Sequence, residues 1–134
     1  IKDLLKKNKA GKIVYISSIS SIHGDYALDG FAGKIPYAAS KAFLNSYVKG
    51  MSRELSKKNI LFNAILPGVV SIPGKYWDKM KKNKPKLVNE YLKKYSPLGR
   101  FAKPQEIAPF VLFLCSKYAS FTSGTLMNID GGKI

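Results

Sequence analysis

The sequence has little cysteine, little arginine and no long apolar run. Its single cysteine, Cys115, cannot form a disulfide framework, so we expect a reducing compartment, the cytoplasm. Cys115 lies in the apolar segment FVLFLCSKY, and we expect it to be a small residue of the core. No apolar run reaches the roughly 18 residues that a membrane-spanning helix requires, so no membrane partner is predicted.

Acidic residues are also scarce, and the positive charge is almost entirely lysine. The chain has 23 Lys and Arg against 8 Asp and Glu, a formal net charge of +15, and its only arginines are Arg53 and Arg100. Such a charge first points to nucleic acid. The lysines, however, are spread over several segments, with no arginine-rich strip and no zinc or helix-turn-helix signature. We therefore predict solvated lysines and neither nucleic acid nor metal as a partner; a basic nucleic-acid-binding module stays as the least favoured alternative.

The order of the apolar segments predicts an α/β fold. KIVYIS and NILFNAIL, residues 12–17 and 59–66, are nearly continuous apolar runs, typical of strands buried on both faces of a parallel sheet. A helix with a wide apolar arc is predicted between them, from about Tyr37 to Lys57, opened by Pro36. Residues 22–35 carry three glycines without periodicity and indicate a loop. The strand, helix and strand form a βαβ unit with a right-handed crossover.

Three further parts follow the second strand. Residues 75–95 are helical in pattern but interrupted by Pro85, which favours two short helices outside the sheet. Residues 103–120 predict another helix, with Pro104 near its start and Glu106 in its first turn. Residues 124–132, GTLMNIDGG, predict a last short strand and turn. The sum is the second half of a Rossmann-like, doubly wound parallel sheet with about three strands.

One side-chain pair in the predicted helix is suited to proton transfer. Tyr37 and Lys41 are four residues apart, so they lie on one helix face. An ammonium group beside a phenol favours the phenolate, which suits a general acid or base. Ser18 and the Pro67–Gly68 pair fall at carboxyl ends of strands, where parallel sheets bind ligands. A tyrosine and a lysine at this spacing are, by themselves, common on surface helices.

The surroundings of this pair carry more information. In order along the chain stand GKIVYISS, PYAASKAFLNSYVKGMSREL, NAILPGVV, PLGRFAKPQEIAPFVLFL and TSGTLMNIDGG. Taken together, these segments resemble the short-chain dehydrogenase/reductase family, from about Lys12 to Gly132. The resemblance implies an oxidoreductase that interconverts a carbonyl and an alcohol by hydride transfer, acts on a small molecule and uses NAD or NADP.

The resemblance also implies roles for individual residues. Tyr37 would exchange a proton with the substrate oxygen, Lys41 would assist Tyr37 and bind the nicotinamide ribose, and Ser18 would orient the substrate. The segment that borders the nicotinamide would consist of Pro67, Gly68 and Val70. Ser21 is the second choice for the serine role, because the strand alignment favours Ser18.

Some features depart from the family pattern. The interval from Ser18 to Tyr37 is longer than usual, as in family members of surface-sugar pathways, which suggests a sugar-linked substrate. His23 and Asp25 in this interval are interpreted as polar loop residues. Tyr76 and Trp77 fall where the family places a substrate-covering segment, so they line the pocket or only pack.

The largest departure is that no glycine-rich phosphate-binding turn stands in the sequence. We therefore expect residues 1–134 to be the carboxyl-terminal part of a single NAD(P)-binding domain whose amino-terminal cofactor-binding half is missing, inactive alone. Residues 1–12 resemble the last turns of a helix, in line with a start further upstream. The helix beginning at Tyr37 is one that the family commonly buries between subunits, which implies a homo-oligomer. A non-catalytic binding protein of the same fold is the main alternative.

Overall fold

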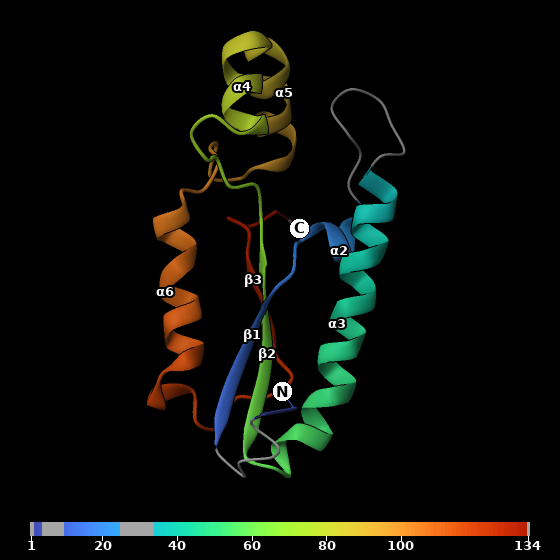
Figure 1. The fold of residues 1–134 in the computed structure, drawn as a ribbon. Helices are drawn as coiled ribbons and strands as arrows, with labels where there is room; N and C mark the ends of the chain where they lie inside the picture. Colours follow the sequence, from blue (N-terminus) through green and yellow to red (C-terminus); the bar gives the residue numbers. More distant parts are fainter. Residues whose placement is uncertain (1, 4–9, 25–33, 134) are drawn as a thin grey trace.

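Three parallel strands form the centre of the molecule (Figure 1). The structure is a computed structural model that describes residues 2–3, 10–24 and 34–133. The strands are β1 (Gly11–Ile16), β2 (Ile60–Pro67) and β3 (Leu126–Ile129), paired in the order β1-β2-β3. The register pairs Gly11 with Ile60 at one end of β1 and Ala64 with Leu126 at the start of β3. All carboxyl ends therefore meet at one edge of the sheet.

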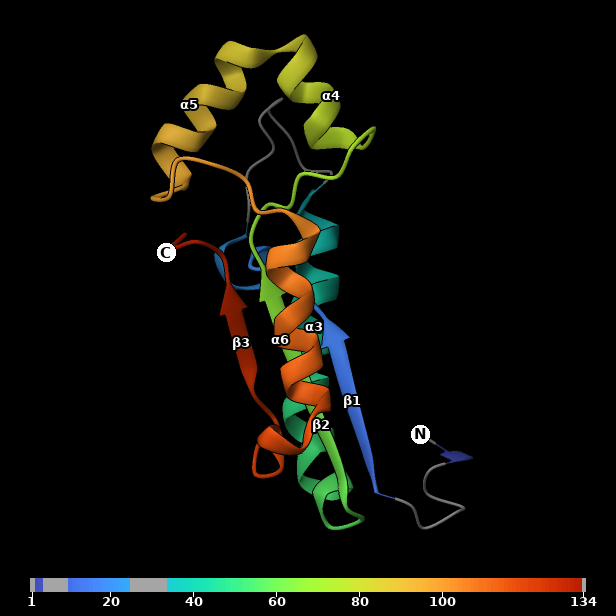
Figure 2. The same cartoon turned by 90° about the vertical axis from the view of Figure 1, so that its left-hand side faces the viewer.

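Two long helices cover the two faces of this sheet. Helix α3 (Lys34–Ser56) lies on one face and α6 (Pro104–Cys115) on the other, as the two views show (Figures 1 and 2). Because side chains alternate along a strand, Phe62, Ala64 and Leu66 of β2 pack under α3, while Ile65 packs with α6. The parallel β1–α3–β2 arrangement is the predicted βαβ unit.

A helical hairpin stands beyond the carboxyl ends of the strands. It consists of α4 (Tyr76–Asn83) and α5 (Pro85–Tyr95), with Pro85 at the start of α5 (Figure 2). The break at Pro85 thus has the expected effect, since proline lacks the N–H that would continue a helix. Two short elements complete the described chain: α2 (Ser20–His23) and the 3-10 helix η1 (Lys117–Ala119).

The predicted strands and long helices are confirmed, but two details were wrong. The segment predicted as a loop begins with the tail of α2, and α3 starts at Lys34, ahead of Pro36. The rest of that predicted loop, residues 25–33 with Asp25, and most of the predicted first helix lie outside the described residues.

Cys115 is exposed, so its prediction as a core residue was also wrong. Helix α6 turns Ile107, Val111 and Leu114 toward the sheet. Cys115 follows Leu114 by one residue, about 100° further around the helix, and therefore faces away from the core.

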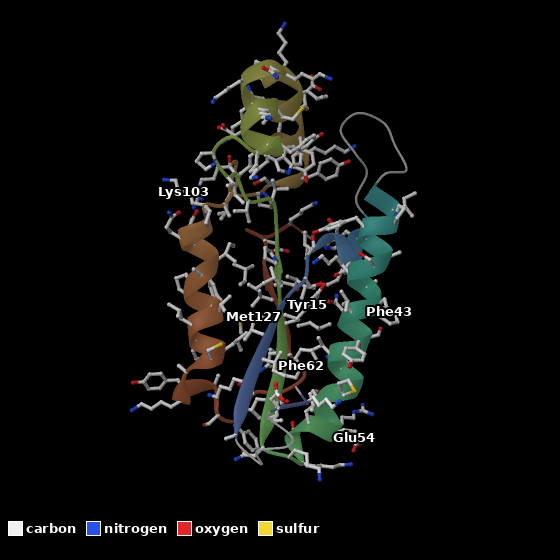
Figure 3. The ribbon with its side chains drawn as sticks, in the orientation of Figure 1. Tyr15, Phe43, Glu54, Phe62, Lys103 and Met127 are labelled. Carbon is white, nitrogen blue, oxygen red and sulfur yellow. The ribbon has the colours of Figure 1, made fainter. Side chains whose placement is uncertain are left out.

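Helix α3 keeps an apolar side that nothing in the described chain covers. Val48 and Leu55 are buried against the sheet, whereas the Phe43 side chain is 69% exposed. Figure 3 shows Phe43 on the outer side of α3, with Phe62 between the helix and the sheet. Within the described residues, no helix has both the length and the apolar character needed to cross a membrane.

Candidate active site

The predicted site residues lie where β1 and β2 end. Ser17 and Ser18 follow β1 directly, and Pro67 closes β2. Two backbone hydrogen bonds hold the segments together: Ser17 N–H donates to Ile65 O at 2.8 Å and Ile19 N–H to Pro67 O at 3.0 Å. The serine segment thereby runs alongside the end of β2.

A cavity opens between these segments and α3. Its volume is about 420 Å³, within the range of small-molecule sites. Five of the predicted site residues line it: Ser18, Tyr37, Pro67, Gly68 and Val70. The structure therefore brings the predicted serine, tyrosine and proline-glycine segment to one cavity. Its backbone wall at 67–70 and the facing phenol suit a flat, polar ring such as nicotinamide.

Lys41 lies one helical turn after Tyr37 and is held in place by β1. Its Nζ donates to Tyr15 Oη at 3.1 Å and to Ile16 O at 2.9 Å. The same nitrogen is 5.7 Å from the centre of the Tyr37 ring. Lys41 is thus fixed beside the phenol by two bonds, although it is not itself among the side chains that line the cavity.

Sequence reasoning missed Tyr15, whose hydroxyl is one of the two acceptors for Lys41. The alternation of side chains along a strand could have identified this residue from the sequence. Tyr15 lies two residues before Ser17, so both point toward α3, the helix that carries Lys41.

The serine cluster divides into structural and cavity-facing members. Ser17 Oγ donates to Asn45 Oδ1 at 2.6 Å, and Asn45 Nδ2 donates to Ser21 Oγ at 2.6 Å. Ser21 Oγ also donates to the carbonyl oxygen of Ser18. Ser17 and Ser21 are therefore used to attach the segment to α3. Asn45, buried in α3, is a second residue that sequence reasoning missed.

Ser18 differs from these two serines because its side chain lines the cavity. Its Oγ accepts a hydrogen bond from Ser20 N–H at 3.2 Å, so its own hydrogen can be donated to a ligand. Ser21 is not among the residues that line the cavity. Of the two alternatives, the geometry favours Ser18.

Gly68 sits where no side chain fits. A Cβ atom added there would lie 2.8 Å from Asp130 Cα, and this neighbour is backbone, which cannot swing aside. The glycine thus lets the turn after β2 pass close to the turn after β3. The cavity wall formed by residues 67–70 depends on that approach.

Trp77 lines the cavity from the hairpin side. Its ring centre lies 5.1 Å from that of Tyr91 and 4.9 Å from that of Phe101. Trp77 therefore both borders the cavity and packs in an aromatic cluster. Tyr76, its neighbour, is 44% exposed and does not line the cavity.

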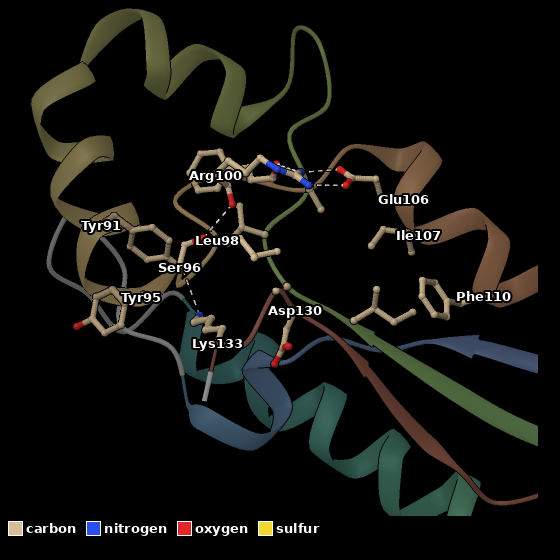
Figure 4. A pocket seen from close by; sticks show the side chains of 16 residues that line it. Tyr91, Tyr95, Ser96, Leu98, Arg100, Glu106, Ile107, Phe110, Asp130 and Lys133 are labelled. Carbon is tan, nitrogen blue, oxygen red and sulfur yellow. Dashed lines mark hydrogen bonds and ion pairs between the residues drawn. The ribbon is translucent and has the colours of Figure 1, made fainter.

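A second, smaller cavity of about 210 Å³ lies behind the same wall (Figure 4). Gly68 and Val69 line both cavities. Arg100 and Glu106 form an ion pair at the rim, with Nη2 and Oε1 2.6 Å apart. The Arg100 guanidinium and the Lys103 backbone N–H lower the pKa of Glu106 to about 2. Asp130 Oδ2 is buried here without a hydrogen-bond partner in the described chain.

The predicted loop contains two further polar residues, His23 and Asp25. His23 ends α2 and is exposed, and Asp25 lies outside the described residues. No group of three or more His, Cys, Asp or Glu side chains suited to a metal ion occurs in the part of the chain that the structure describes.

The sheet has parallel strands with helices on both faces, and a Tyr-Lys pair lies at its carboxyl edge. These features define a Rossmann-like α/β protein of the dehydrogenase type. Comparison with known proteins agrees. The sequence model of a family described as enoyl-(acyl carrier protein) reductase matches residues 1–133. The chain belongs to the short-chain dehydrogenase/reductase family.

Relatives of known name are similar along nearly the whole chain. A 3-oxoacyl-(acyl carrier protein) reductase from Thermotoga maritima is 37% identical over 128 residues, which is 96% of this chain and 47% of the relative. A sorbitol-6-phosphate 2-dehydrogenase from Klebsiella pneumoniae is 36% identical over 135 residues, 95% of this chain and 48% of the relative. The chain therefore spans about half the length of the curated relatives that it matches.

Solved structures show the same fold with cofactors bound. A 4-hydroxyisoleucine dehydrogenase mutant complexed with NADH and succinate has a TM-score of 0.84 and 30% identity, covering 98% of this chain and 50% of that one. An L-sorbose reductase from Gluconobacter frateurii complexed with NADPH and L-sorbose has a TM-score of 0.80 and 27% identity, with the same coverage.

Proposed function

We propose that the protein to which this chain belongs is an NAD(P)-dependent oxidoreductase that interconverts a carbonyl and an alcohol. The main support for this proposal is that Ser18 and Tyr37 line one cavity, while two hydrogen bonds fix Lys41 beside Tyr37. Membership of the family and the NADH- and NADPH-bound solved structures support the same activity.

Ser18, Tyr37 and Lys41 have different tasks in the proposed reaction. When bound, the nicotinamide cofactor supplies or accepts the hydride. Tyr37 gives its phenolic proton to the carbonyl oxygen during reduction and takes it back during oxidation. Lys41, which its two hydrogen bonds hold beside Tyr37, is proposed to keep its ammonium group next to the phenol during this transfer. Ser18 donates a hydrogen bond to the same substrate oxygen and keeps it within reach of Tyr37.

The cofactor would lie against the backbone after β2. Pro67, Gly68 and Val70 are proposed to border the nicotinamide, and Tyr37 and Lys41 to contact the adjoining ribose. The residue that chooses between NAD and NADP would contact the other half of the cofactor. We propose that this half is bound by a segment upstream of residues 1–134, in line with the half-length coverage of the relatives.

The substrate is proposed to be a small molecule. The long interval between Ser18 and Tyr37 favours a sugar-linked compound, and two similar proteins are named for sugar substrates, sorbitol 6-phosphate and L-sorbose. Others are named for acyl groups on a carrier protein. A homo-oligomer that buries the outer face of α3 is proposed as the assembly, supported by the exposed Phe43.

Replacement of the phenol tests the proposed chemistry. In the native full-length protein, Tyr37→Phe is expected to lower kcat at least about 100-fold, because general acid–base catalysis contributes roughly that factor or more. Cofactor binding, measured by calorimetric titration, is expected to change little. Steady-state rates with a panel of sugar and acyl carbonyl compounds give the first quantity.

Tyr118→Phe is the matched control, since Tyr118 is 77% exposed and lies beyond the amino-terminal ends of the strands. Near-normal turnover of Tyr37→Phe would contradict the proposed function. The intact mass and amino-terminal sequence of the same native protein show whether the chain extends upstream, as the proposal requires.

A further inference from the structure

The hairpin beside the candidate active site is unusually rich in lysine. We call residues 75–95, which contain α4 and α5, the lysine hairpin. Eight of its residues are lysines, and only Asp78 and Glu90 are acidic. The lysines are Lys75, Lys79, Lys81, Lys82, Lys84, Lys86, Lys93 and Lys94. The hairpin is about one sixth of the chain but holds more than a third of its positive side chains, so the charge is concentrated here.

Packing turns this charge outward. The apolar side of the hairpin, with Trp77, Met80 and Val88, packs on Val69 and Phe101 at the end of the sheet. Because both helices bury one face, all eight lysines lie on the exposed surface. The lysine hairpin therefore borders the candidate site with a basic surface.

Lys81 is the lysine that the structure connects most directly with the cavity. It follows Trp77 by four residues, so the two share a helix face. Its Nζ lies 5.1 Å from the centre of the Phe101 ring, which in turn lies 4.9 Å from the ring of Trp77. An ammonium group thus sits on the aromatic cluster of which Trp77, a cavity-lining residue, is part.

The acids of the hairpin do not cancel this charge. Asp78 accepts from Gly74 N–H at 2.9 Å and pairs with Lys82 at 3.2 Å. The Gly74 N–H and Lys82 lower the pKa of Asp78, so it stays ionised and engaged within the hairpin. With one further acid, Glu90, against eight lysines, the hairpin carries a clear net positive charge.

We propose that the lysine hairpin recognises a phosphate group on the substrate, held on the Trp77 side of the cavity while the reacting carbonyl lies between Ser18 and Tyr37. This inference rests on the proposed function. A phosphate monoester carries close to two negative charges at neutral pH, so each ammonium attracts it more strongly than a carboxylate. Flexible lysines bind phosphate as point charges and tolerate substrates of different length.

Two kinds of small molecule would bring phosphate charge, a sugar phosphate or a thioester of coenzyme A, whose ribose carries a phosphate monoester, and matched pairs distinguish them. The first pair is fructose 6-phosphate and fructose. The second pair is acetoacetyl-CoA and S-acetoacetyl-N-acetylcysteamine, which lacks every phosphate. Binding is measured by calorimetry to the native full-length protein saturated with NADP⁺ or NAD⁺, so that the cofactor site is occupied.

In at least one pair, the phosphorylated member is expected to bind about tenfold tighter or more, as several exposed charge contacts together would give. This preference for the phosphorylated member over its unphosphorylated partner is expected to fall steeply between 0.15 and 0.5 M salt. The pair that shows the preference identifies the source of the phosphate.

Three neutral substitutions, two in α4 and one at the residue before it, test the hairpin itself. In the triple variant Lys75→Gln, Lys79→Gln and Lys81→Gln, the preference is expected to fall to about threefold or less. The control triple variant changes Lys49, Lys58 and Lys117 to Gln, which removes the same charge from exposed positions away from the hairpin. The control is expected to keep the preference of the parent within about twofold.

The proposal is overturned if neither phosphorylated compound binds tighter than its partner, or if the hairpin variant keeps the full preference. It is also overturned if a single-stranded RNA 20-mer binds tighter than both phosphorylated compounds and only the hairpin variant loses that binding. Reduction of S-acetoacetyl-N-acetylcysteamine or fructose, which needs no phosphate, tests the oxidoreductase chemistry separately. A failure of that chemistry is therefore distinguishable from a failure of phosphate recognition.

Discussion

Gly68 is the residue at which the candidate site depends most directly on backbone packing. The turn after β2 passes so close to Asp130 that a methyl group at residue 68 has no free space. The same residue lines the cavity that holds Ser18 and Tyr37 and the smaller cavity behind it. Any shift of this turn would move the wall of both cavities.

Gly68→Ala is therefore expected to lower the free energy of unfolding by about 1–3 kcal/mol, the usual cost of overpacking against rigid neighbours. It is also expected to weaken cofactor binding in the native protein. Urea denaturation and cofactor titration measure the two effects.

Gly50→Ala serves as the matched control. Gly50 lies inside α3 with open space at its Cβ position, so alanine should raise the free energy of unfolding by about 0.5–1 kcal/mol. Equal stability of both alanine variants would show that the close approach to Asp130 is not limiting.

Among the elements, α6 has the most fully specified beginning. Pro104 stands in its first turn, and the Glu106 side chain accepts from the Lys103 backbone N–H at 2.9 Å. Glu106 also forms a two-pronged pair with Arg100, at 2.8 Å and 2.6 Å. The helix start, the turn at Arg100 and the second cavity are thus tied together by one carboxylate.

This carboxylate predicts a pH dependence of stability. The pKa of Glu106 is lowered to about 2 in the folded protein, from an ordinary value of 4.5. A lowered folded pKa stabilises the fold above the unfolded value, and this contribution is lost as the pH falls from about 4.5 toward 2. The Glu106→Gln variant should therefore be less stable than the parent at pH 6, and the difference should shrink as the pH falls through that window.

Urea denaturation of parent and variant at several pH values between 6 and 2.5 measures this difference. A gap that stays constant over the whole range would contradict the assigned role of the Glu106 charge.

At the scale of the whole molecule, the outer face of α3 is the apolar surface that points to assembly. Phe43 is 69% exposed on a helix whose opposite side is buried against the sheet. Large apolar side chains at the centre of a subunit interface are costly to replace by charge.

Phe43→Glu is expected to weaken self-association of the native protein at least about tenfold, because a carboxylate would be desolvated in the interface. Sedimentation velocity over a range of concentrations measures this. Lys49→Glu, on another side of the same helix, is the control and should leave the association nearly unchanged. Unaltered association of Phe43→Glu would place the interface elsewhere.

Much of the architecture was predictable because it depends on local pattern. Continuous apolar runs of strand length indicated β1 and β2, and the interruption at Pro85 separated α4 from α5. The Tyr37–Lys41 spacing placed both residues on one helix face, and strand ends marked Ser18 and Pro67 as neighbours. Cys115 was misassigned because an apolar helix segment does not reveal which of its residues faces the sheet.

The sequence by itself determined the order of elements, the helix that carries Tyr37 and Lys41, and the family to which the motifs belong, because these follow from periodicity and fixed spacing. Only the tertiary structure decided that Tyr15 holds Lys41, that Asn45 engages Ser17 and Ser21, and that Ser18 is left to line the cavity. These contacts join residues 24 to 28 positions apart on different elements, so they depend on how α3 packs against β1, which no local pattern specifies.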